Sequence, residues 1–247
     1  MRKWALFGIF LLTQSFLSPL YSQINDPQSI SGGFAAGMHG TSRGLGIELE
    51  LAKGPMQRQF LYGLSLHQLK DLREVQIESF FGDQGRSYVY GKLNHFVVLQ
   101  PSFGIQYHLI PKSHLNVMQI LGGIKIGPSI GFLNPYFLEI YLPGPNPGNQ
   151  NRDIVPFNPA EHTYGRIYGR ASLVSSRLEL SPVIGMGIKA HALIDFGRNT
   201  RNISALKLGV NLDAFAKQVP ILQERDGIDN NRLFFAVSAG LLFGRRW

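Results

Sequence analysis

The chain has 247 residues, of which 44% are apolar and 28 are glycine, and its formal charge at pH 7 is +8. It contains no cysteine, which excludes a disulfide framework and a lipid anchor attached through a cysteine. After the first segment no run of about 18 apolar residues occurs, which excludes a membrane protein built from apolar helices. Any membrane span must therefore be made of strands.

The first segment has the pattern of a secretory signal peptide. A basic start precedes an apolar region at 4–17 and an acceptable cleavage site at 20–22. A lone membrane anchor is the alternative, but the apolar run is short for a membrane span. We therefore predict that residues 1–22 are removed and that residues 23–247 form a single outer-membrane β-barrel domain.

The mature chain is rich in segments that alternate between apolar and polar residues. The clearest is 44–52, where the leucines and the isoleucine face one side and Glu48 and Glu50 face the other. The eight predicted strands are, in chain order, 31–38, 44–52, 60–68, 96–109, 117–132, 178–196, 203–215 and 232–247. The last of them carries no charge on either face from Leu233 to Gly244. Such a strand is typical of the closing strand of a membrane barrel.

The connections between these strands fall into two classes. If the chain starts in the periplasm, the periplasmic connections are the short segments 53–59, 110–116 and 197–202. The external connections include three long segments, 69–95, 133–177 and 217–231. We interpret 133–177, with its Pro- and Gly-rich stretch at 143–149, as turns and extended chain rather than regular sheet, with a short strand or helical turn within 166–174 as an alternative.

Short periplasmic turns and long external loops on an even number of strands are the outer-membrane pattern. A soluble β-sandwich is the alternative, but it has no reason to sort its loops in this way. The predicted fold class is therefore all-β: a transmembrane, antiparallel, up-and-down β-barrel of 8 strands, with long extracellular loops and short periplasmic turns. The predicted location is the outer membrane of a Gram-negative bacterium, with both termini periplasmic.

Aromatic residues near the strand ends agree with this interpretation, because such residues form girdles at the two membrane interfaces. The predicted girdle residues are Tyr62, Tyr107, Phe132, Tyr136, Phe196, Phe215, Phe243 and Trp247.

The predicted inward face of the barrel is polar. An eight-stranded barrel is just wide enough for its own side chains to fill the interior, so we expect no open pore. Charges in such a lumen must pair or be hydrated. The predicted structural network contains Glu48, Glu50, His67, His108, Lys125, Lys189, His191, Lys207 and Asp213. A paired-carboxylate site at Glu48 and Glu50, or a metal site at the three histidines, is the less favoured alternative.

Motifs of soluble enzymes are missing from the sequence, including the Gly-x-Ser-x-Gly elbow, the His-Glu-x-x-His run and the phosphate-binding Gly-Lys-Ser/Thr loop. A Ser/His hydrolase with His162 and Ser172, Ser175 or Ser176 in one external loop remains a third alternative. We predict no catalytic residue, no cofactor and no bound metal. The scattered Lys and Arg residues suit an anionic membrane surface, and we predict no nucleic-acid partner.

One external stretch is unusually apolar for an exposed loop. Residues 136–145 read YFLEIYLPGP, and we predict that this stretch contacts another protein rather than folding back over the barrel. The predicted contact residues are Tyr136, Phe137, Leu138, Ile140 and Tyr141.

Four short stretches carry a resemblance to known proteins. They are YGKLN at 90–94, GPSIGFLNPY at 127–136, YGRA at 168–171 and FGRR at 243–246. With them the chain resembles a group of small outer-membrane β-barrel proteins of the Bacteroidota, over nearly all of its mature length. The resemblance implies an outer-membrane barrel with periplasmic ends, and it supplies no catalytic residue.

The sequence thus predicts a non-enzymatic barrel that serves as a structural or accessory subunit of an outer-membrane complex and binds partners through its external loops. A surface receptor or a narrow channel for small solutes is the main alternative, and a lipid-modifying hydrolase is the third. The expected partners are outer-membrane lipid and lipopolysaccharide, other outer-membrane proteins, and the barrel-insertion machinery during assembly.

Overall fold

The computed structural model describes residues 31–55, 57–81, 85–110, 118–142, 151–159, 161–162, 164–172, 179–197, 201–224 and 229–247. The predicted signal peptide lies outside the described residues, and its removal stays a prediction. Among the described residues, no helix is long and apolar enough to cross a membrane.

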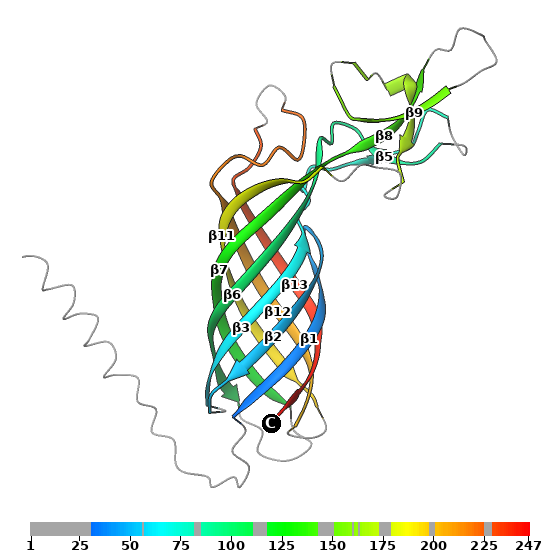
Figure 1. Ribbon diagram of the computed structural model, residues 1–247. Coiled ribbons are helices and arrows are strands. Elements are labelled where there is room, and N and C mark those ends of the chain that lie inside the picture. Colours follow the sequence, from blue (N-terminus) through cyan, green and yellow to red (C-terminus); the bar gives the residue numbers. More distant parts are fainter. Residues whose placement is uncertain are drawn as a thin grey trace, which may run out of the picture.

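Eight antiparallel strands close into a barrel (Figure 1). In chain order they are β1 (Gly32–Thr41), β2 (Gly44–Lys53), β3 (Arg58–Gln68), β6 (Asn94–Ile110), β7 (Gln119–Pro135), β11 (Ser181–Asp195), β12 (Asn202–Phe215) and β13 (Leu233–Arg246). Each pairs with the strand before and after it, so the barrel is of the up-and-down type. This confirms the predicted fold class and the predicted number of strands.

The last strand closes the barrel against the first. The register of β1 and β13 runs from Gly33 opposite Arg246 to Thr41 opposite Ser238 without a break. This pairing leaves no open sheet edge, which a structure surrounded by lipid could not tolerate. We call the end of the barrel where β1 begins and β13 ends the terminal end, and the opposite end the long-loop end.

The outer face of the barrel is an apolar surface. The side chains that alternate outward along the strands are largely exposed, including Met38 at 73%, Leu45 at 75% and Ile184 at 69%. The intervening side chains point into the lumen and are buried. A closed sheet with apolar residues outside and polar residues inside is the pattern of a transmembrane barrel.

Some predicted girdle aromatics take this outer position and others do not. Tyr62, Tyr107, Phe196, Phe243 and Trp247 are exposed. Phe215 and Tyr136, by contrast, are 5% and 2% exposed, so their assignment to a girdle is wrong. Phe215 has inward parity on β12 and lies in the lumen, while Tyr136 follows the end of β7 and lies in the long loops.

The long connections contain more regular structure than the sequence indicates. Within 133–177, strands β8 (Phe137–Leu142), β9 (Asn151–Pro156) and β10 (Ile167–Arg170) form a three-stranded sheet in the order β10-β8-β9. A short 3-10 turn, η2, spans Tyr164–Arg166. The interpretation of this segment as turns without regular sheet is therefore wrong, although β10 lies within 166–174, where a short strand was the alternative. The Pro and Gly residues at 143–149 lie in the connection between β8 and β9, outside the described residues.

The sheet β10-β8-β9 and the hairpin of β4 (Gln76–Ile77) with β5 (Tyr88–Val89) form a small lobe, which we call the loop lobe. Figure 1 shows it at the long-loop end, to one side of the barrel axis. Strands β6 and β7 lead into it, and both are 17 residues long. A tilted membrane strand needs about 9 to 11 residues, so these two strands extend beyond the membrane span.

Candidate functional site

Two lysines and two glutamates form a cluster of charges in the middle of the lumen, which we call the charge cluster. Lys207 Nζ donates to Glu48 Oε2 at 2.8 Å and to Glu50 Oε1 at 2.5 Å. Lys125 Nζ donates to Glu50 Oε1 as well and lies 3.5 Å from Glu48 Oε2. All four side chains are buried. The structure thus brings together four of the residues that the sequence places in the lumen.

The position of these residues follows from strand parity. Glu48 and Glu50 are successive inward residues of β2, and Lys125 and Lys207 are inward residues of β7 and β12. The two carboxylates and the two ammonium groups have a net charge of zero when all four are ionised. Each carboxylate contacts both lysines, which supports a structural ion-pair network rather than an acid/base site.

Other polar pairs extend this layer. Lys189 Nζ donates to Ser65 Oγ at 2.6 Å, and Ser129 Oγ donates to Asp213 Oδ1 at 3.0 Å. His67 Nε2 lies 3.7 Å from Asp213 Oδ2. These contacts join β3 to β11 and to β12, and β7 to β12, across the lumen. The two hydrogen bonds provide buried side chains with partners inside the barrel, whereas His67 Nε2 lies beyond hydrogen-bond distance of Asp213.

The three predicted lumen histidines lie at different heights. His67 is opposite Gly46 on β2, towards the long-loop end. His191 Nε2 lies 3.2 Å from Gln106 Oε1, and His108 is opposite Leu121 near the terminal end of β6. Within the described ranges, no three His, Asp or Glu side chains are grouped so as to hold a metal ion.

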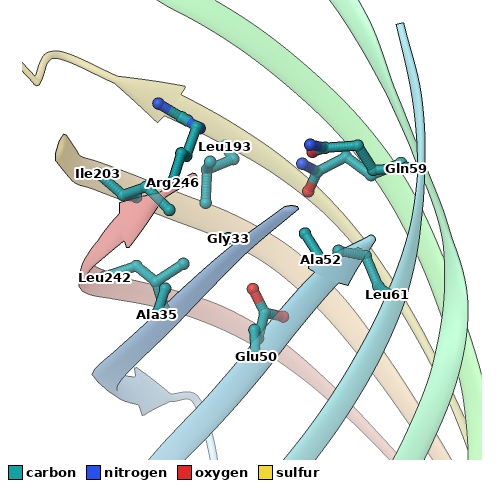
Figure 2. Close-up of a pocket in the computed structure, with 11 residues that line it drawn as sticks. Gly33, Ala35, Glu50, Ala52, Gln59, Leu61, Leu193, Ile203, Leu242 and Arg246 are labelled. Carbon is teal, nitrogen blue, oxygen red and sulfur yellow. The ribbon is translucent and has the colours of Figure 1, made fainter. Parts of the chain in front are cut away.

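Two small cavities border the charge cluster on different sides. Figure 2 shows the first, of about 30 Å³, which is lined by Glu50, Leu61 and Leu193 together with Arg246. The second, of about 20 Å³, is lined by Glu48, Lys125, Lys189, His191 and Lys207 among others. A water molecule requires about 10 to 15 Å³ of such volume, so the first cavity has room for about two or three waters and the second for one or two.

Apolar side chains fill the lumen at the long-loop end. Phe96, Phe215 and Phe234 pack with ring centroids 5.0 to 6.2 Å apart. Leu69, Val219 and Ile221 from the long connections belong to the same buried cluster. We call this cluster the mouth cluster. Sequence reasoning missed it, although the inward parity of Phe96 and Phe234 was a signal that could have found it.

A second apolar layer and a buried ion pair close the terminal end. The apolar layer contains Ala35, Leu121, Leu193, Ile203, Ala205 and Leu242. Arg246 Nη2 donates to Asp195 Oδ2 at 2.6 Å, and Gln119 Nε2 donates to the same oxygen at 2.7 Å. Sequence reasoning missed Arg246, although its inward parity on β13 also predicts this position.

The loop lobe has a core of its own. Tyr88, Tyr136, Leu138, Ile140, Phe157 and Ile167 form one buried cluster. Of the predicted partner-contact residues, Tyr136, Phe137, Leu138 and Ile140 are buried, and Tyr141 is half-buried between the rings of Phe81 and Tyr168. The apolar character of 136–141 therefore reflects burial within the lobe, and contact with a partner through the predicted stretch stays a prediction.

Specific bonds join the long connections to one another and to the barrel. Lys92 Nζ donates to Glu74 Oε2 at 2.5 Å within the first connection, and the Leu93 backbone N–H donates to the Ile221 carbonyl of the third connection at 2.8 Å. Asn94 Nδ2, at the start of β6, donates to the Pro220 carbonyl at 2.7 Å. Burial lowers the pKa of Lys92, while the Glu74 carboxylate acts in the opposite direction. Tyr136 Oη accepts from the Val89 backbone N–H, and burial raises its pKa. The three long connections thus form one folded assembly.

The surface of the loop lobe exposes two aromatic rings. Phe80 is 67% exposed and Tyr164 is 43% exposed, and their ring centroids lie 6.4 Å apart in an edge-to-face arrangement. Phe80 also packs edge-on against Phe81 at 5.9 Å. These rings lie outside the predicted contact stretch, and they form an apolar surface that sequence reasoning missed.

The third alternative, a hydrolase, depends on His162. Its Nδ1 accepts a hydrogen bond from the Asn158 backbone N–H at 2.9 Å, and partial burial lowers its pKa. Ser172 is half-buried, whereas Ser175 and Ser176 lie outside the described residues. The described contacts of His162 thus stabilise a turn of the loop lobe.

A pH-dependent contact is expected in the connection 69–95. Both oxygens of Asp71 accept bonds from Arg73, at 2.9 and 2.8 Å, and these bonds lower the pKa of Asp71 below its usual value. A lowered carboxyl pKa stabilises the fold above the unfolded-state value of about 4, and this contribution is lost as the pH falls through the folded-state value. We expect amide exchange at 71–74 to accelerate below about pH 4.

Hydrogen exchange followed by mass spectrometry, corrected for the intrinsic pH dependence of exchange, measures this effect. Asp71→Asn is the matched control, because it should show the faster exchange already at pH 7. Equal protection of 71–74 in the original chain at pH 7 and at pH 3 would contradict the expectation.

Comparisons with known proteins give matches to solved structures only. No protein-family model matches the chain, and no curated protein matches it. Neisserial surface protein A is 9% identical, with a TM-score of 0.39, over 89% of this chain and 96% of that one. Ail, the attachment invasion locus protein of Yersinia pestis, solved in complex with the heparin analogue sucrose octasulfate, is 8% identical, with a TM-score of 0.31, over 89% and 97%. OprG from Pseudomonas aeruginosa, an outer membrane protein, is 8% identical, with a TM-score of 0.34, over 89% and 95%.

Proposed function

We propose that this protein is a non-enzymatic outer-membrane barrel that holds the loop lobe at the membrane surface as a structural or accessory subunit of an outer-membrane complex. The long-loop end faces the cell exterior and both termini face the periplasm. The host is a Gram-negative bacterium of the Bacteroidota, as the sequence resemblance implies.

The observation that carries this proposal is the contrast between the lumen and the loop lobe. Three successive layers fill the lumen: the mouth cluster, the charge cluster and the apolar layer at the terminal end. The long connections, in contrast, form a lobe with its own core and with exposed aromatic rings at Phe80 and Tyr164. Loops on a rigid scaffold are where binding usually resides, and exposed aromatic residues are enriched at protein interfaces.

Cross-linking tests the proposal directly. A photoreactive phenylalanine analogue at position 80 or 164 should give an adduct of one defined mass in intact cells. The same analogue at Phe235, which is 55% exposed on the outer barrel face, is the matched control. The double variant Phe80→Ala/Tyr164→Ala should reduce co-purification of that partner from solubilised membranes by at least about tenfold, the range expected when interface hot spots are truncated.

Two outcomes would contradict the subunit role. One is a protein that runs alone in every detergent extract. The other is a partner that is retained in full by the double variant, because the exposed rings would then have no part in the contact.

The main alternative is a narrow channel or receptor for small solutes, and it is favoured only by the two small cavities beside the charge cluster. Planar-bilayer recordings separate the two functions. A sealed lumen gives no reproducible conductance steps above background, whereas a channel gives steps of constant size.

A further inference from the structure

Three cationic side chains lie at the border of the apolar outer face, at the terminal end of the barrel. Lys53 is the last residue of β2, Arg58 the first of β3 and Arg245 the penultimate residue of β13. Each has the outward parity of its strand and is exposed. Within the eight barrel strands as the structure describes them, no other outward-facing position carries Lys, Arg, Asp or Glu.

The three cations gather on one side of the barrel. Strands β13, β1, β2 and β3 are consecutive neighbours in the closed sheet, and they carry all three residues. Neighbouring strands lie about 4.8 Å apart, so the cations span about 15 Å of the rim. The outward positions of β12, β11, β7 and β6 at the same end are uncharged. On the described strands the outward basic positions of this end thus lie in one sector, while exposed Arg201 lies in the connection between β11 and β12.

Aromatic rings accompany these cations. The Arg58 guanidinium carbon lies 5.5 Å from the Phe60 ring centroid and 6.0 Å from the Tyr107 ring centroid. In the ladders, Lys53 is opposite Phe60, and Arg245 is opposite Phe34. Phe34, Phe60 and Tyr107 are all exposed on the outer face. An aromatic ring at the level of the headgroups with a cation beside it marks the interface between hydrocarbon and phosphate.

The nearby acidic side chains do not neutralise this sector. Glu50 is held by Lys125 and Lys207 inside the lumen, and Asp195 is 1% exposed and held by Arg246. At the long-loop end the exposed charges lie in or next to the connections and include both acids, such as Glu78 and Asp229, and bases, such as Lys70 and Lys217. Lys53, Arg58 and Arg245, in contrast, lie on the outward face of the barrel strands themselves.

We propose that Lys53, Arg58 and Arg245 form a binding site for the phosphate headgroup of an anionic phospholipid, whose acyl chains lie on the apolar outer face of β1, β2, β3 and β13. The cations supply the charge complement to the phosphate, and Phe34, Phe60 and Tyr107 contact the glycerol region. The site selects anionic over zwitterionic lipid, and it lies at the leaflet that contacts the terminal end. This inference requires the membrane barrel but not the partner of the loop lobe.

The protein contains its own reporter for this site. The sequence has 2 tryptophans, Trp4 in the predicted signal peptide and Trp247 at the end of β13. Trp247 is 56% exposed, and its backbone N–H donates to the Gly32 carbonyl at 3.0 Å, beside the basic sector. Fluorescence of the chain with Trp4→Phe therefore reports on lipid beside Trp247, through quenching by brominated acyl chains.

The experiment reconstitutes this chain in phosphatidylcholine vesicles that contain either dibrominated phosphatidylglycerol or dibrominated phosphatidylcholine at equal mole fraction. Each basic residue near an anionic lipid surface contributes about a fivefold preference, so an excess of at least about fivefold for phosphatidylglycerol is expected in the quenching-derived association constant. High salt should reduce this excess, because exposed charges are screened. The triple variant Lys53→Gln/Arg58→Gln/Arg245→Gln should lose it.

A matched triple variant, Lys70→Gln/Lys217→Gln/Arg232→Gln, removes three exposed cations from the long-loop end and should keep the preference. Equal quenching by the two brominated lipids in the protein with Lys53, Arg58 and Arg245 intact would overturn the proposal. A preference for phosphatidylglycerol that persists in the triple variant of these residues, the rim variant, would overturn it as well. If the rim variant does not fold, two other measurements test the proposal. They are the salt dependence of the preference for phosphatidylglycerol and the single variant Arg58→Gln, which should lose part of that preference. A preference unaffected by both salt and Arg58→Gln overturns the proposal in the same way.

Discussion

Replacing Lys207 with Met is expected to lower the free energy of unfolding by about 3 to 5 kcal/mol, the cost of leaving a buried charge without its partner. Lys207 donates to both Glu48 and Glu50, and after the substitution only Lys125 remains to balance two buried carboxylates. Urea unfolding of the barrel in detergent or lipid vesicles, followed by the electrophoretic shift between folded and unfolded forms, measures the loss.

The double variant Lys207→Met/Glu48→Gln separates charge balance from packing. It leaves Glu50 and Lys125 as a neutral pair, so it should recover most of the loss. Lys217→Met, at an exposed position, is the control and should change the stability by less than about 0.5 kcal/mol. A loss below about 1 kcal/mol for Lys207→Met would mean that solvent replaces the ion pair, and the filled lumen would then be wrong.

Phe234→Ala is the second substitution with a large expected effect, a loss of about 3 to 5 kcal/mol from removal of a buried aromatic ring. Phe234 is 1% exposed, packs against Phe96 and Phe215, and lies under the Arg43 guanidinium at 5.4 Å. The same urea titration measures the loss. Phe234→Leu keeps most of the packed volume and should lose less than about 2 kcal/mol, near the range of conservative core changes.

The two Phe234 variants together test whether the mouth cluster is packed. A graded loss from Leu to Ala is the signature of a cavity left in a dense core. If both variants lose equally little, the mouth of the barrel is filled by solvent, and the sealed lumen that supports the proposed function is contradicted.

The sequence was sufficient to predict the barrel because successive residues of a membrane strand face lipid and lumen in turn. Apolar residues therefore recur at every second position. The segment around Glu48 and Glu50 showed this alternation clearly, and the same parity placed Lys125 and Lys207 in the lumen. Which lysine meets which carboxylate was not predictable, because that depends on the register of the three strand pairs that join β2 to β12 through β1 and β13, and of the five pairs on the other side of the closed sheet. The register around a closed sheet depends on all of its strand pairs together, and no single strand determines it.

The loop lobe was less predictable, and for a different physical reason. Its core residues, such as Leu138 and Ile140, look like an exposed apolar stretch when they are considered alone. Their partners come from elsewhere in the chain, including Tyr88 in β5 and Ile167 in β10. Short strands of two to six residues carry too few alternations to reveal a sheet, so local pattern could not show what covers this stretch.

The arrangement of the charge cluster has a consequence for assembly. Its residues come from β2, β7 and β12, and none of these strands is a neighbour of another in the barrel. The contacts of Lys207 with Glu48 and Glu50 therefore join positions 159 and 157 residues apart in the chain. Hairpins alone cannot form them, so the contacts require the closed ring. A sheet closed with a slipped register would place these charges opposite the wrong residues, and the cluster therefore favours the native register over slipped ones.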